Sequence, residues 1–243
     1  MKSLLFASAL LCLFVIGGQS VSRGQSPKVF KVRAGHYPEK EIPYASRFQN
    51  ANFQIGTAEF LNGRSSQASF NYSYLGGNIL FLAANKDTLE IIDKALLKKV
   101  EIKGKTYHFD KRFGYCEILR TFNKAKIGKR EVLTKIGTEK GGPYGISYTA
   151  SSVTTYKSYS NDQVSSTKQL TANAEGVFTY RTFHFLIDNN NRFYIPNANS
   201  VSKLFPGHKR QITGFIKENK INFGNEEDLS SLLAFCEGLG VKE

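Results

Sequence analysis

The stretch AEFLNGRSSQASFNYSYLGGNILFLA, residues 58–83, decides the fold class of this chain. Its Asn62-Gly63 pair is typical of a tight two-residue turn, because both residues tolerate the positive backbone angles that such a turn requires. After the turn, apolar and aromatic residues alternate with Ser and Asn as far as Tyr74, which indicates a strand with one buried face and one wet face. The unbroken apolar run at 79–83 favours a strand covered on both sides. The stretch therefore predicts antiparallel β-structure.

The chain keeps this texture of short strands between turns up to residue 196. Further strands are expected at VEI (100–102) and TYHFD (106–110), which form a hairpin around Gly104, and at YCEIL (115–119), REVLTKI (130–136), GVFTYRTFHFLID (176–188) and RFYIP (192–196). Such spacing favours an antiparallel sheet that curls into a sandwich or a partial barrel. Residues 51–196 are therefore expected to form one antiparallel β domain.

Two segments differ from this pattern. Residues 23–50 are expected to be an extended N-terminal segment. Residues 141–171 are rich in Ser, Thr and Tyr and poor in aliphatic residues, which favours a long loop within the β domain.

The last 47 residues, 197–243, show helical periodicity instead. Apolar residues recur at i, i+3 and i+4 in three segments: Val201, Leu204 and Phe205; Ile212, Phe215 and Ile216; and Leu229, Leu232 and Leu233. Asn225, followed by three acidic residues, is typical of a helix start. Because helices this short cannot make a stable core alone, we expect two or three of them to pack on the β domain as a C-terminal cap. The expected fold class is α+β, mainly β.

The N-terminal residues 1–22 have the features of a secretory signal peptide. A lysine at position 2 precedes an apolar run at 4–16, and small residues follow it, with Ser20 or Ser22 as the residue before the cut. The apolar run is too short to cross a bilayer as a helix, and no other apolar run in the sequence is longer. We therefore expect an exported protein that has no transmembrane segment after cleavage, whether periplasmic, outer-membrane-associated or extracellular.

Two cysteines, Cys116 and Cys236, remain once the leader with its Cys12 is removed. In an oxidising compartment they could form a disulfide that closes a long loop. Alternatively, both are buried thiols, because each lies on an apolar face, one in a strand and the other in a helix. The sequence leaves both alternatives open.

Positive charge is concentrated in one region. The chain carries a net charge of +13, and residues 97–140 hold 13 Lys and Arg against 5 Asp and Glu, a net charge of +8. The basic-looking stretch at 203–220 lies in a neutral region, since residues 197–243 hold 6 residues of each sign. We therefore expect an acidic partner to contact the basic region at 97–140, with four candidate residues: Lys124, Lys126, Lys129 and Arg130.

Two blocks of the sequence resemble a family of uncharacterised exported proteins of Bacteroidota-type bacteria. They are AEFLNGRSSQASFNYSYLGGNILFLAANKDTLEI (58–91) and KLFPGHKRQITGFIKENKINFGNEEDLSSLLAFC (203–236), and the similarity covers most of the chain from about Arg33. The first block of that family tends to read Asn-Tyr-Asn, whereas this chain has Ser73 at the third position. The resemblance implies an envelope location and an accessory, non-catalytic role, and it carries over no active site.

Enzymatic chemistry finds little support in the sequence. The histidines 36, 108, 184 and 208 are scattered, without the paired spacing of a metal site, and His108 and His184 are expected on the wetter faces of their strands. The sequence contains no Gly-x-Ser-x-Gly motif, and Gly76-Gly77 is not followed by a helix as a phosphate-binding loop would be. Glu59 and Glu117 could cleave a glycoside only if the fold brought them together. No catalytic, cofactor or metal residue is predicted.

The expected function is that of an exported, non-enzymatic structural or binding protein of a bacterial cell envelope. Its partner would be an anionic envelope component, such as a glycan or lipopolysaccharide, or an acidic protein surface. The alternative is a secreted hydrolase whose site is assembled from distant residues. Nucleic acid is not an expected partner, because export removes the protein from the usual targets.

Overall fold

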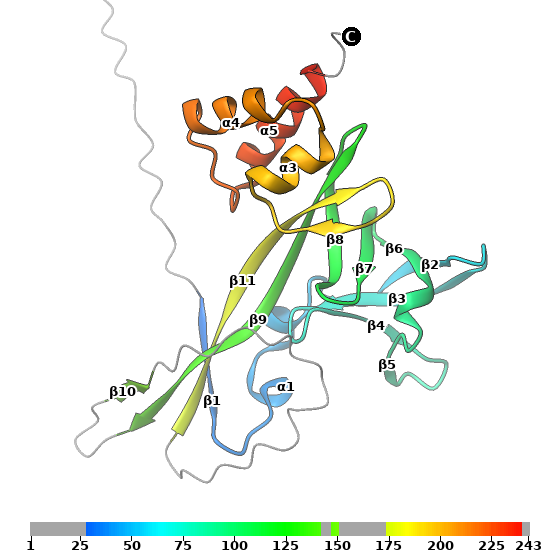
Figure 1. Ribbon diagram of the computed structural model, residues 1–243. Helices are drawn as coiled ribbons and strands as arrows, with labels where there is room; N and C mark the ends of the chain where they lie inside the picture. The colour runs from blue at the N-terminus through cyan, green and yellow to red at the C-terminus, as the bar shows by residue number, and fades with distance from the viewer. Residues whose placement is uncertain (1–27, 142–146, 151–173, 240–243) are drawn as a thin grey trace, which may run out of the picture.

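The computed structural model describes residues 28–141, 147–150 and 174–239 (Figure 1). The expected signal peptide at 1–22 and most of the expected loop at 141–171 lie outside these residues. The strands are β1 (Val29–Arg33), β2 (Gln54–Phe60), β3 (Ser65–Ser73), β4 (Asn78–Leu82), β5 (Thr88–Glu90), β6 (Leu97–Ile102), β7 (Lys105–Asp110), β8 (Gly114–Thr121), β9 (Ala125–Gly141), β10 (Ser147–Ala150), β11 (Ala174–Asp188) and β12 (Phe193–Tyr194). The helices are α1 (Pro38–Glu41), α2 (Tyr44–Arg47), the 3₁₀ helix η1 (Lys94–Leu96), α3 (Ala198–Leu204), α4 (Lys209–Glu218) and α5 (Glu226–Leu239).

The sheet is antiparallel and is not closed. Its order is β1-β11-β9-β8-β7-β6-β2-β3-β4-β5, while β10 pairs with β9 and β12 pairs with β11. The mainly β fold with short C-terminal helices confirms the predicted fold class. None of the described helices is long and apolar enough to span a bilayer.

The long strands β9 and β11 are the axis of the molecule. They pair from Ala125–Asp188 at one end to Lys140–Ala174 at the other. Figure 1 shows them running from the helical cap to the opposite end, where β1 and β10 lie beside them. On the edge that faces away from β9, β11 pairs with β1 at 175–179 and with β12 at 186–187. The residues between these two stretches pair with neither strand.

One hydrophobic core lies between strands β2–β4 and strands β6–β8. It is built from buried residues of both groups: Ala58, Phe70, Tyr72, Ile79, Leu97, Val100, Ile102, Tyr107 and Tyr115. The rings of Tyr72 and Tyr107 stack with their centroids 5.7 Å apart. The turn after β3 then meets the edge of β9 beyond the end of β8, where the backbone N–H of Leu133 donates to the carbonyl oxygen of Tyr74 at 2.8 Å.

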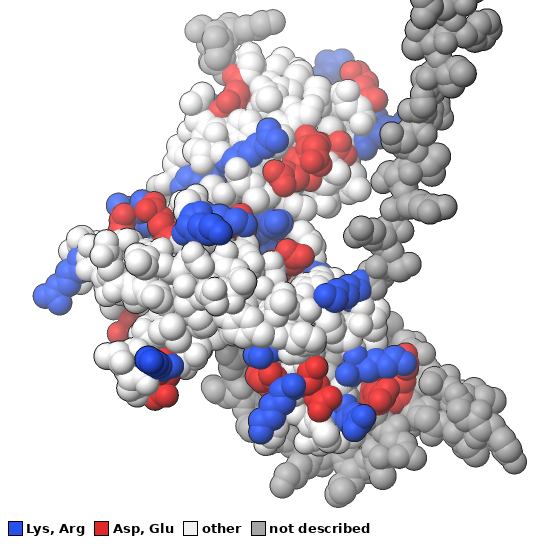
Figure 2. All heavy atoms as spheres, turned by 180° about the vertical axis from the view of Figure 1, so that it is seen from behind, with Lys and Arg blue, Asp and Glu red and all other residues white. Residues whose placement is uncertain are grey.

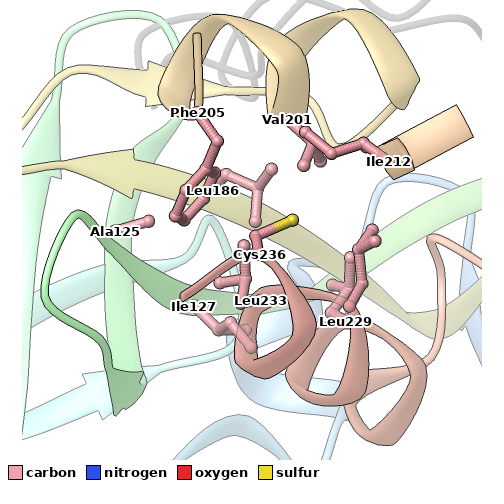
Figure 3. Close-up of a cluster of buried hydrophobic side chains, with 10 residues drawn as sticks. Ala125, Ile127, Leu186, Val201, Phe205, Ile212, Leu229, Leu233 and Cys236 are labelled. Carbon is pink, nitrogen blue, oxygen red and sulfur yellow. The ribbon is translucent and has the colours of Figure 1, made fainter. Parts of the chain in front are cut away.

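The helical cap packs on the end of β9 and β11 through a core of its own (Figure 3). Ala125, Ile127 and Leu186 of the strands meet Val201, Phe205, Ile212, Leu229, Leu233 and Cys236 of the cap. The oxygen Oδ1 of Asn225 accepts a hydrogen bond from the backbone N–H of Asp228 at 2.9 Å, which confirms the predicted start of α5. The cap therefore shares its core with the sheet, as the periodicity predicted.

Several local expectations were wrong. The first hairpin has a three-residue loop, because Phe60 pairs with Arg64 and only Gly63 has a positive φ, of 82°. Segment 23–50 is not simply extended, since it holds β1, α1 and α2. Part of the expected loop at 141–171 is strand β10. Asn71 and Ser73 were expected on a wet face, but both are buried. Asn71 holds the preceding loop, because its Nδ2 donates to the carbonyl oxygen of Asn50 at 2.8 Å.

Candidate functional site

The principal candidate site is a cavity of about 990 Å³ on one side of β9 and β11. Five groups of described residues line it. They come from α1, α2 and the residue after them (Pro38, Glu39, Arg47, Phe48), the β3–β4 region (Ser73, Leu75, Gly76, Asn78, Leu80), the β7–β8 turn (Arg112, Phe113), the two long strands (Arg130, Val132, Leu133, Thr134, Lys135, Phe178, Thr182, Phe183, His184, Phe185) and two loops of the cap region, before α3 and between α4 and α5 (Ile195, Pro196, Phe223, Gly224). A site assembled in this way is invisible to a local sequence pattern.

The side chain of Arg130, on β9, lines this cavity and is held in one position by its contacts. Its Nη2 donates to the carbonyl oxygen of Gly76 at 3.1 Å. A Cβ atom at Gly77 would lie 2.9 Å from Nη2, and one at Gly114 would lie 3.3 Å from Nε, so two glycines leave the space that the guanidinium occupies. Both glycines have positive φ, 70° and 75°, which glycine adopts without strain. Two segments that are distant from β9 in sequence, the Gly76-Gly77 turn and the turn at Gly114, thus define the position of Arg130.

The guanidinium of Arg130 lacks a compensating acid in the described part of the chain. Its Nε is buried without a hydrogen-bond partner, and no carboxylate oxygen of a described residue lies within 4.0 Å of its nitrogens. Partly burying an unpaired charge is unfavourable, so an anion beside it would be favoured. Arg is also the side chain best suited to bind a carboxylate or phosphate with two parallel hydrogen bonds.

The described wall of the cavity carries an excess of positive charge. Arg47, Arg112, Arg130 and Lys135 line it, against one acidic residue, Glu39. The Nε of Arg47 donates to the carbonyl oxygen of Ile42 at 2.8 Å, and Arg112 lies 3.8 Å from an oxygen of Asp110. A concave, low-dielectric wall of one sign concentrates counter-ions, so the field of this cavity favours anions.

The four basic residues singled out from the sequence do not form one surface. Arg130 lines the large cavity, whereas Lys129, its neighbour in β9, borders a cavity of about 10 Å³ together with Glu117 and Glu131. Lys126 donates to Oδ1 of Asn191 at 3.0 Å, and Lys124 lies 6.0 Å from the ring of Phe205 in the cap. The structure therefore separates Arg130 from the three lysines.

Much of the basic region at 97–140 is paired with acidic residues. Lys99 lies 3.0 Å from Glu59 and 2.6 Å from Glu101, and Lys105 lies 2.9 Å from Glu117. Lys98, Arg112 and Arg120 also have acidic neighbours. On the face of the molecule shown in Figure 2, Lys and Arg are scattered, with Asp and Glu beside many of them. The local charge of +8 thus does not produce a single basic face.

The proposed Cys116–Cys236 disulfide does not form. Both cysteines are free and buried, and they belong to different cores: Cys116 packs with Phe185 and Ile187, whereas Cys236 lies inside the cap (Figure 3). Burial raises the pKa of the Cys236 thiol to about 12, and burial also raises the pKa of the Cys116 thiol. The buried-thiol alternative is therefore the correct one.

The histidines also differ from their expected positions. His108 is buried, at 9% exposure, rather than on a wet face, and its burial lowers its pKa to about 4. His184 is half-buried at the cavity, and burial lowers its pKa as well. In the described ranges, neither ring is hydrogen-bonded to a Ser or Thr hydroxyl or grouped with acids or cysteines as a metal site would be.

The carboxylate pair Glu59 and Glu117 is not brought together. Glu117 is opposite Tyr107, Tyr107 is opposite Val100, and Val100 is opposite Ala58, so Glu117 shares a sheet face with Ala58. Glu59 therefore points to the other face. Glu117 instead accepts hydrogen bonds from Gln49 at 3.0 Å and from Lys105 at 3.1 Å. This arrangement does not provide the two facing carboxyl groups of a glycosidase.

Sequence reasoning missed the cavity and most of the residues that form it. Among the cationic residues of its wall, only Arg130 had been identified, and then as part of an exposed cluster. No protein-family model matches the chain, and comparisons with curated proteins and with solved structures give no significant match.

Proposed function

We propose that this protein is an exported, non-enzymatic binding protein of a cell envelope that holds an anionic ligand against Arg130. The observation that carries the proposal is the guanidinium of Arg130, positioned by Gly76, Gly77 and Gly114 without an acidic partner among the described residues. The leader-like residues 1–22 support the location. The expected binding site is thus no longer the whole basic region at 97–140 but the guanidinium of Arg130 at the wall of the cavity.

A hydrolase is less well supported by the same wall. A hydrolytic site needs a nucleophile or activated water, a base within hydrogen-bond reach and a group that stabilises developing charge. The described wall carries the imidazole of His184 and three hydroxyls, those of Ser73, Thr134 and Thr182, but no hydrogen bond joins the imidazole to any of these hydroxyls. Ser73 donates instead to the carbonyl oxygen of Leu75 at 3.1 Å. The cavity wall thus offers cations for binding more plainly than it offers a base for catalysis.

The proposal can be tested with 1-anilinonaphthalene-8-sulfonate, a fluorescent apolar anion. We expect saturable binding to the full-length protein and at least tenfold weaker binding to Arg130→Gln, because the sulfonate loses its charged partner. Lys126→Gln is the matched control, since Lys126 lies on the same strand but bonds to Asn191 outside the cavity. Circular dichroism and unfolding midpoints should show that both variants are folded.

Two results would overturn the proposal. One is a wild-type protein that binds no anilinonaphthalene sulfonate. The other is a folded Arg130→Gln variant that binds the probe as tightly as Lys126→Gln does. Binding should also weaken as the salt concentration rises from about 50 to about 500 mM, because added ions screen the attraction between the cationic wall and the ligand.

A further inference from the structure

The cavity wall is apolar on most of the surface that surrounds Arg130. More than half of its described residues bring only hydrocarbon or aromatic side chains to the wall, among them Phe113, Val132, Leu133, Phe178, Phe185 and Ile195. Burying apolar ligand surface against such side chains is the main source of affinity in small-molecule sites. A fully hydrated inorganic anion would gain nothing from them.

The cavity is also long. On β11 its wall runs from Phe178 to Phe185, seven residue steps that span roughly 23 Å in an extended strand. The volume of about 990 Å³ lies at the upper end of the usual range of small-molecule sites, roughly 300–1,000 Å³. These dimensions suit an elongated ligand better than a compact one.

An anionic glycan fits this wall poorly. Sugar hydroxyls need hydrogen-bond partners when they leave water, and an unmatched hydroxyl in an apolar site is unfavourable. The hydroxyl of Ser73 is committed to the carbonyl oxygen of Leu75, whereas the buried hydroxyl of Thr134 has no hydrogen-bond partner among the described residues. The few neutral polar side chains of the described wall, which also include Asn78 and Thr182, are outnumbered by its apolar side chains, so most hydroxyls of a bound sugar would face hydrocarbon. The described wall therefore matches a ligand with one charged end and a hydrocarbon body.

We propose that the ligand is a single-chain amphiphile, a long alkyl chain that ends in one carboxylate or phosphate group. This inference rests on the proposed function, because it places the head group at Arg130. The chain lies along β9 and β11 against the apolar wall, with Ile195 on the side of the cap. The bound molecule can be a free fatty acid or a monoacyl phosphate lipid, which share this chemistry.

Calorimetric titration with alkyl ligands below their micelle concentrations tests the inference. We expect affinity to rise about fourfold for each added methylene from octanoate to hexadecanoate until the cavity is filled. Hexadecyl phosphate tests the phosphate source of the head group, and hexadecanol is the uncharged control. Hexadecanol should bind at least tenfold more weakly than hexadecanoate, and the difference should be lost in Arg130→Gln.

A variant at the apolar wall provides an independent test. Ile195 is 61% exposed and lines the cavity, so Ile195→Asp places a charge there without disturbing a buried core. We expect it to weaken binding of hexadecanoate at least tenfold and to leave octanoate nearly unchanged. Ile55→Asp is the matched control, because Ile55 is 79% exposed on β2 and is not part of the described wall.

The outcomes separate the two proposals. If anilinonaphthalene sulfonate binds in an Arg130-dependent way but the affinity of alkyl anions does not depend on chain length, the amphiphile inference is wrong and the anion site stands. Failure of hexadecanoate and hexadecyl phosphate to bind or to displace the probe leads to the same conclusion. If Arg130→Gln changes the affinity of none of these ligands, the anion site itself is wrong.

Discussion

Arg130 of β9 donates a hydrogen bond from Nη2 to the carbonyl oxygen of Gly76, 54 residues earlier in the chain, at 3.1 Å. The contact joins a long central strand to the turn between β3 and β4. The same turn meets β9 again where Leu75 and Leu133 form an isolated parallel bridge. The position of the cationic group thus depends on how the two parts of the sheet meet.

This dependence predicts that Gly77→Ala is strongly destabilising. The added Cβ would lie 2.6 Å from Cγ1 of Val132 and 2.9 Å from Nη2 of Arg130, at a φ of 70°. The left-handed backbone alone costs about 1–2 kcal/mol for a residue with a Cβ, and the steric clash adds to it. We expect the free energy of unfolding to fall by about 2–4 kcal/mol in urea titrations, with weaker anion binding.

Gly104→Ala is the matched control for this change. Gly104 has a similar φ of 78°, but no atom lies within 4 Å of the position of its Cβ. Only the backbone strain should remain, about 1–2 kcal/mol, and anion binding should be unchanged. Equal losses in the two variants would show that Gly77 is not needed to make room for Arg130.

Glu117 is expected to stabilise the fold more than an exposed carboxylate does. Its side chain is 11% exposed and accepts hydrogen bonds from Gln49 and Lys105, and Gln49 in turn accepts one from the hydroxyl of Tyr107. Glu117→Ala leaves these donors without their acceptor, which should reduce the free energy of unfolding by about 2–4 kcal/mol.

The comparison variant for Glu117 is Glu59→Ala. Glu59 also forms ion pairs, with Lys98 and Lys99, but these lie at the surface. Exposed ion pairs contribute little to stability, so we expect no measurable change in the urea midpoint. A Glu117→Ala variant as stable as Glu59→Ala would show that the buried hydrogen bonds are dispensable.

The free cysteines predict a specific labelling pattern. In the native protein neither Cys116 nor Cys236 should react quickly with iodoacetamide, because both are buried and burial raises the pKa of each thiol. After unfolding without a reductant, the tryptic peptides that contain them should both carry the label. A peptide pair linked by a disulfide would contradict the structure.

The elements of this fold were predictable because their signals are local. Alternation marks β3, the Asn225 cap marks α5, and the spacing of Ile212 with its apolar neighbours marks α4. Each signal depends on the residues of one strand or helix and on the single face that it buries.

Burial on a second face was not predictable in the same way. Asn71 and His108 lie on faces that a strand pattern assigns to solvent, yet other segments cover them, in the case of Asn71 the loop that holds Asn50. The cavity is a similar case, since the position of the Arg130 side chain depends on the space left by Gly77 and Gly114, which are distant in sequence. The net charge of residues 97–140 suggested a basic surface. A sum of charges does not show which lysines have acidic partners in the fold.

His108 predicts how stability depends on pH. Burial, together with the nearby charges of Lys126 and Lys99, lowers its pKa to about 4, against the opposing effect of a hydrogen bond with the backbone of Lys98. The unfolded chain takes up this proton near pH 6.5, above the folded pKa, so the contribution is full above pH 6.5 and is lost as the pH falls toward 4. The loss should reach about 3 kcal/mol at pH 4.

Urea titrations of wild type and His108→Phe between pH 7.5 and 4 measure this contribution. The variant is expected to lose less stability than wild type over pH 6.5–4, because a phenyl ring has no proton to gain. His208→Gln is the control, since His208 lies in the cap and contacts Gln211 rather than the core. Parallel curves for wild type and His108→Phe would mean that His108 is not held neutral in the folded protein.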